Sequence, residues 1–261
     1  MTRIFDETGA RLEEWKRRAE VLGVILVGSK AVAHADALSD DDLEILLTDE
    51  AFGRLAPAGC HELRVENEGA QARIIYDALY TTLTDLKKKT ASPRDLDHWP
   101  YETAQVLFAR DPRVREAVEA AARMAEEFRR ARLLHATIDA WAASRRAAKT
   151  VKRGHEAATR LVIARGAKAL ARVIFALEWR WVPLDHWIEA ELGTLEDRAG
   201  AGAHLLEAIR TGNPDELAAG LDCLEDQLYA EGVARPDGRI ALFLELVHPS
   251  RADERLAHGL Y

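Results

Sequence analysis

The sequence predicts an α/β domain with a mixed sheet over residues 1–110, followed by an all-helical bundle over residues 111–261. Two observations carry this prediction. In the first part, short apolar runs and period-two alternation indicate strands. After Arg110 no strand pattern returns, and apolar residues recur every three or four positions, as in amphipathic helices. We therefore expect the domain boundary near Arg110.

The α/β part begins with an amphipathic pattern that places Leu12, Trp15 and Ala19 on one face of a helix. This helix should cover the sheet. A short helix is expected after Gly28, and Gly69 should mark a turn. The predicted strands are Val21–Val27, Asp42–Leu47, His61–Glu66 and Arg73–Tyr80.

The helical part is divided by glycine and proline residues that typically end helices. Asp111 and Pro112 provide a cap and first turn for the leading helix. The expected helices cover about residues 112–148, 151–180, 184–192, 200–211, 214–230 and 238–247.

Composition limits the class of protein. The 261 residues carry a net charge of −8, which disfavours general nucleic-acid binding, since that relies on neutralising phosphates. No apolar run approaches the roughly 20 residues that span a bilayer, and the first residues lack a signal-peptide core, so we expect a cytoplasmic protein without membrane contact. Cys60 and Cys223 are too few for a disulfide framework or a cysteine zinc site.

One block of the helical part departs from this acidic average. Residues 129–180 hold thirteen basic residues against three acidic ones. Such a block could attract a polyanion such as a nucleoside triphosphate, or it could be an ordinary solvated helix surface.

The segment between the first two strands holds a dense cluster of acids. Asp40, Asp42 and Glu44 should lie on the face of the second strand opposite Leu43 and Ile45. Neighbouring carboxylates repel unless a cation or protons lie among them, and oxygen ligands of this kind suit Mg²⁺. Gly28, which lacks a Cβ, would let a phosphate approach the backbone.

These residues resemble the signature of the polymerase-β-like nucleotidyltransferase superfamily. The signature here is the strand Val24–Val27, then Gly28-Ser29, then Ser39-Asp40-Asp41-Asp42-Leu43. The chain looks most similar to the bacterial antibiotic, aminoglycoside-type nucleotidyltransferases, which join such a domain to a helical one. The resemblance implies that Gly28 and Ser29 bind the triphosphate and that Asp40 and Asp42 hold Mg²⁺.

The chain departs from the family pattern after Ser29. An arginine and a glycine are usual where this chain has Val32 and Ala33, so Lys30 would have to supply the positive charge. The motif also allows a second register, in which Asp42 and Glu44 form the metal pair. In both registers Asp42 is a ligand.

A third carboxylate completes the metal site in the resembled family. Asp77, within the predicted strand Arg73–Tyr80, is the candidate, with Glu66 as the alternative acid. The resemblance gives Asp77 a role in metal binding and in activating the acceptor hydroxyl, and Glu102 is a further candidate base.

The segment Phe175–Trp187 resembles a part of the family's helical domain that shapes the acceptor pocket. An asparagine and a lysine are usual where this chain has Glu178 and His186. For Trp181 and Trp187, core packing is the expected role.

The implied activity is transfer of AMP, with ATP as co-substrate and Mg²⁺ as cofactor, to a hydroxyl of a small acceptor such as an aminoglycoside-like antibiotic. Two alternatives stay open. One is a modifier of protein or RNA of the toxin–antitoxin kind, and the other is a nucleotide-binding module that has lost transfer. The sequence does not specify the oligomeric state.

Overall fold

The computed structural model describes residues 4–32, 34–67 and 72–260, and the expected turn at Gly69 lies outside them. The chain divides into two compact units, Met1–Arg123 and Met124–Tyr261. The first holds a mixed five-stranded sheet with helices, and the second is helical, as the sequence predicts.

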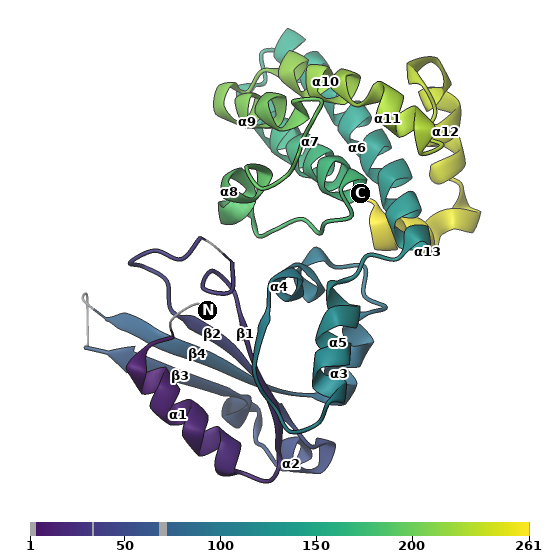
Figure 1. Cartoon of the computed structure of the whole chain (residues 1–261). Helices are drawn as coiled ribbons and strands as arrows, with labels where there is room; N and C mark the ends of the chain where they lie inside the picture. Colours follow the sequence, from purple (N-terminus) through teal and green to yellow (C-terminus); the bar gives the residue numbers. More distant parts are fainter. Residues whose placement is uncertain (1–3, 33, 68–71, 261) are drawn as a thin grey trace. The chain divides into compact units, whose positions relative to one another are not determined.

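The sheet of the first unit has the strand order β3-β4-β2-β1-β5 (Figure 1). β2 and β4 are parallel, and the other neighbouring strands are antiparallel. The strands are β1 (Val21–Val27), β2 (Asp41–Leu47), β3 (His61–Glu66), β4 (Arg73–Thr82) and β5 (Gln105–Ala109). The first four match the predicted strands to within two residues, whereas β5 is not among the predicted strands.

Both faces of this sheet carry helices. α1 (Asp6–Arg17) packs Leu12 and Trp15 on the face that holds Leu43 and Ile45 of β2. Three helices form the second core on the opposite face, around Ile25 and Leu46. They are α3 (Leu83–Lys89), α4 (Trp99–Glu102) and α5 (Arg113–Ala122), while α2 (Asp49–Gly53) follows β2. The predicted covering helix is therefore confirmed, and so is the predicted alternation of β2.

α5 belongs to the first unit, because Val114 of α5 lies so close to Gly23 of β1 that an added Cβ there would be only 2.8 Å from it. The sequence pattern merged α5 with the next helix into one helix over 112–148. The structure interrupts that helix at residues 123–125, where Arg123 is extended. The division between the units accordingly lies at Arg123, after α5 rather than before it.

The second unit is built on two long antiparallel helices, α6 (Glu126–Lys152) and α7 (Glu156–Leu177), joined by a tight turn in which Gly154 has a φ of 70°. Gly166 of α7 lies directly against Ala143 of α6, a close approach that a side chain would prevent. The remaining helices are α8 (Ile188–Leu192), α9 (Ala201–Thr211), α10 (Pro214–Cys223), α11 (Glu225–Ala230), α12 (Arg239–Leu246) and α13 (Ala252–His258). None of the described helices is long and apolar enough to cross a membrane.

Candidate functional site

The Gly28-Ser29 segment that follows β1 is a turn, not the short helix expected from the sequence. The amide of Ala31 donates to the carbonyl of Gly28 at 3.0 Å, which closes a four-residue turn. Gly28 has a φ of 71°, a conformation that costs glycine little and other residues more. Ser29 at its centre is buried.

The carboxylate of Asp42 lies directly over this turn. A Cβ added to Gly28 would be 2.8 Å from the Asp42 Cγ and closer still to its Oδ2. The sheet explains this contact, since Val27 at the end of β1 pairs with Asp42 near the start of β2. Glycine is therefore required at position 28 by the backbone angle and by the adjacent acid together.

Asp42 also lies beside two other predicted acids. In the parallel pair β2 and β4, Asp42 is the direct neighbour of Asp77, so both side chains lie on the same face. Burial, together with the charges of Asp40, Asp77 and Asp41, raises the pKa of Asp42 to about 7. Burial also raises the pKa of Asp40, with contributions from the charges of Asp77 and Asp41. Three predicted site acids thus interact electrostatically.

Asp77 has a partner of its own. The ring Nε2 of His61 in β3 contacts the Asp77 carboxylate, and both side chains are partly exposed. His61 was not among the predicted site residues. The hairpin register provides the signal, because the pairing of Leu63 with Asp77 places His61, two residues earlier, diagonally beside Asp77.

Lys30 does not point freely toward a phosphate. Its ammonium lies 2.8 Å from Asp41 Oδ1 and 3.2 Å from the centre of the Phe5 ring, and the Lys30 side chain is 8% exposed. Asp41 is fully buried and also accepts hydrogen bonds from the Phe5 amide at 2.9 Å and the Thr8 hydroxyl at 2.5 Å. Lys30 therefore holds the turn to the α1 side of the sheet, while its charge still lowers the pKa of Asp42.

Glu44, the alternative metal ligand, is also held by the protein. It is buried, accepts a hydrogen bond from the Tyr101 hydroxyl at 2.7 Å and pairs with Lys89 at 3.0 Å. Burial and Glu44 both raise the pKa of Tyr101, which keeps its proton on the donor side of this bond. These partners favour the pairing of Asp40 with Asp42. The other candidates lie apart in the fold, with Glu66 exposed at the end of β3 and Glu102 ending α4.

The hydrogen-bond and charge partners of the acids indicate whether these residues could hold Mg²⁺. Among the residues that the structure describes, no hydrogen bond reaches the Asp42 carboxylate, and its raised pKa shows a charge that lacks compensation. A bound cation would supply that compensation. The described part of the chain contains no group of three or more His, Cys, Asp or Glu side chains arranged to hold a metal ion. The Asp40 and Asp42 pair and the three-acid set with Asp77 both stay predictions.

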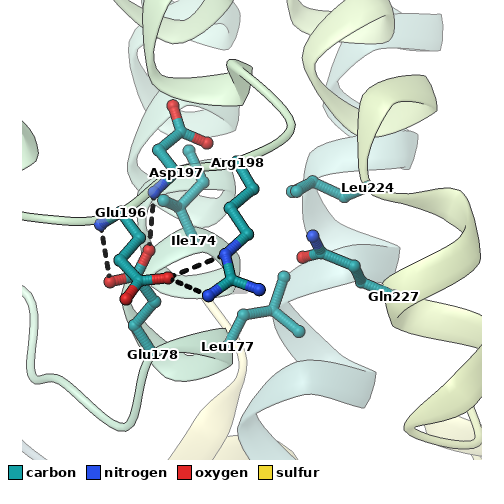
Figure 2. A pocket seen from close by; sticks show the side chains of 8 residues that line it. All are labelled: Ile174, Leu177, Glu178, Glu196, Asp197, Arg198, Leu224 and Gln227. Atoms are coloured by element: carbon teal, nitrogen blue, oxygen red, sulfur yellow. Dashed lines mark hydrogen bonds and ion pairs between the residues drawn. The ribbon is translucent and has the colours of Figure 1, made fainter.

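The helical unit places Glu178 at the end of α7. Its carboxylate accepts hydrogen bonds from the amides of Glu196 at 3.0 Å and Asp197 at 2.8 Å. Figure 2 shows these bonds at the wall of a cavity of about 350 Å³, with Arg198 reaching across it. Glu178 thus fastens a loop to α7. His186 is exposed beside Trp187, which is half-buried, and Trp181 is 1% exposed, which confirms core packing for Trp181.

No protein-family model matches the chain, and no curated protein matches it. Among solved structures, the chain is similar to a nucleotidyltransferase-like protein from Exiguobacterium sibiricum 255-15. The two share 15% identity with a TM-score of 0.45 over 96% of this chain and 86% of that one. A likeness at this level assigns no family.

Proposed function

We propose that the first unit is a nucleotidyltransferase that transfers AMP from ATP, with Mg²⁺, to a hydroxyl of a small acceptor. The observation that carries this proposal is the position of Asp42, an uncompensated carboxylate lying against the Gly28-Ser29 turn. A glycine turn and a carboxylate that accepts no hydrogen bond among the described residues are thereby adjacent. The Gly-Ser and Ser-Asp-Asp-Asp motif supports the same activity.

The motif suggests a role for each residue. Gly28 and Ser29 would bind the phosphates, and Asp40 and Asp42 would hold Mg²⁺. When bound, Mg²⁺ neutralises charge on the phosphates and on the leaving pyrophosphate. Lys30 would act by fixing the turn through Asp41 rather than by contacting phosphate.

The reaction balances without a further co-reactant. The acceptor oxygen forms a bond to the α-phosphorus, the bond from that phosphorus to the bridging oxygen breaks, and pyrophosphate leaves with the electron pair. The hydroxyl proton passes to a base, for which Asp77 is proposed because it neighbours Asp42 across the strands. Holding the reactants in line supplies much of the acceleration.

The test supplies α-labelled ATP and Mg²⁺ to a panel of hydroxylated acceptors. It measures transfer of the label to the acceptor together with release of unlabelled pyrophosphate. We expect Asp42→Asn to lower the rate at least a hundredfold, with Glu50→Gln as the control because the Glu50 side chain is 85% exposed. An unchanged rate in Asp42→Asn would refute the site. Label that travels with added protein or RNA would instead indicate a macromolecular modifier, and ATP binding without turnover would indicate a silent nucleotide-binding module.

A further inference from the structure

The sheet face that carries Asp42 is only half covered by helices. Strand register places Leu63, Asp77, Asp42 and Val27 in one row across β3, β4, β2 and β1. The next row contains His61, Leu79, Glu44, Ile25 and Val106. Helices α3, α4 and α5 cover Ile25 and bind Glu44, so they protect the β2, β1 and β5 end of both rows.

At the other end of the two rows, the described side chains are largely exposed. Leu63 is 49% exposed and Leu79 is 45% exposed, although they lie on strands inside or at the edge of a sheet. Between them stand Asp77 and His61, which are 38% and 51% exposed. Two exposed leucines lie beside the proposed base. A ligand that covers them would bind favourably, because apolar surface would be removed from water.

We propose that the acceptor lies on this exposed face, with an apolar portion against Leu63 and Leu79 and its hydroxyl at Asp77. The inference rests on the proposed nucleotidyl transfer and specifies its acceptor: a hydroxylated compound with an apolar body, rather than a uniformly polar polycationic sugar. The strand register supports this placement, because Leu63 is the direct neighbour of Asp77, and Asp77 is the direct neighbour of Asp42.

A small molecule fits this face better than a protein partner. A specific protein interface buries roughly 800 Å² on each side. Two half-exposed leucines interrupted by His61 and Asp77 offer far less apolar surface than that. A protein covering these rows would also block access to Asp77 and Asp42.

The experiment uses the full chain and two variants, Leu63→Ser and Leu79→Ser. Leu161→Ser is the matched control, since Leu161 is 66% exposed on α7 of the other unit. Labelled ATP with Mg²⁺ is given to acceptors that range from aminocyclitols and simple sugars to hydroxylated aromatic and macrocyclic compounds. The same compounds are titrated against protein with ¹³C-labelled leucine methyls and a non-hydrolysable ATP analogue.

We expect transfer to the compounds with an apolar body and shifts of the Leu63 and Leu79 methyl signals. Each serine variant should raise the acceptor KM about tenfold or more, leaving the KM for ATP unchanged, because the lost contact is apolar and remote from the nucleotide. Transfer to aminocyclitols at a rate that neither variant changes would overturn the inference, as would label on a macromolecule or a panel that shifts neither methyl. Failure of ATP itself to bind would instead overturn the proposed function.

Discussion

Replacing Asp42 by asparagine should stabilise the metal-free protein at alkaline pH. Burial and the charges of Asp40, Asp77 and Asp41 raise the pKa of Asp42 from 3.8 to about 7. Between these values the folded state binds more protons than the unfolded state, so stability falls as the pH rises through this window. Asparagine keeps the shape and removes the charge that causes the loss.

The size of the effect follows from the shift. Each pKa unit corresponds to 1.36 kcal/mol, so the full shift sets an upper bound of about 4 kcal/mol. Because the carboxylate keeps some contact with water, we expect about 2 kcal/mol in favour of Asp42→Asn at pH 8, falling to near zero at pH 3.5. Saturating Mg²⁺ should reverse the order, since a ligand at a hundred times its Kd stabilises the binding form by about 2.7 kcal/mol.

Hydrogen exchange of the β1 and β2 amides is the appropriate measurement, because it reports on the first unit separately from the second. Glu50→Gln should leave exchange unchanged at every pH. A difference between wild type and Asp42→Asn that does not vary with pH would refute the reasoning, and so would a destabilised Asp42→Asn at pH 8 without Mg²⁺.

Three further predictions concern single contacts. Gly28→Ala should cost more than about 2 kcal/mol of stability in denaturant unfolding and abolish stabilisation by Mg²⁺, because the added Cβ meets the Asp42 carboxylate at a φ of 71°. Lys30→Met should cost about 3–5 kcal/mol by leaving Asp41 as an unpaired buried charge, and adding Asp41→Asn to it should restore part of the loss. Burial, with the charges of Arg132 and His135, lowers the pKa of His258 from 6.5 to about 4, so the stability it contributes above pH 6.5 should be lost as the pH falls toward 4. Hydrogen exchange of α13 should show this loss in wild type and not in His258→Gln.

The strands could be predicted from the sequence because burial on a pleated sheet imposes a period of two that short segments retain. Val21–Val27 and His61–Glu66 were placed to the residue for this reason. The break between α5 and α6 was not predicted, since residues 123–125 contain no glycine or proline and the apolar spacing continues across them. The end of α5 is decided by its packing on β1, which local sequence does not contain.

The contacts that the site residues make could not be predicted from the local sequence pattern either. Lys30 and Asp41 are eleven positions apart, and Asp77 meets His61 from another strand. From the sequence, Lys30 was therefore expected to contact the phosphate. In the structure it pairs with Asp41, an acid of the same motif. Hairpin register is the kind of information that would have identified His61.

The Ser-Asp-Asp-Asp stretch shows how one residue type takes two roles within three positions. Side chains of adjacent strand residues point to opposite faces, so Asp41 enters the α1 face and Asp42 the other. On the α1 face Asp41 finds Lys30, the Thr8 hydroxyl and the Phe5 amide, which together compensate a fully buried charge. On the other face Asp42 meets two more acids and a glycine turn. Asp41 therefore stabilises the fold. The fold in turn holds Asp42 beside two other acids, where we propose that the cation binds.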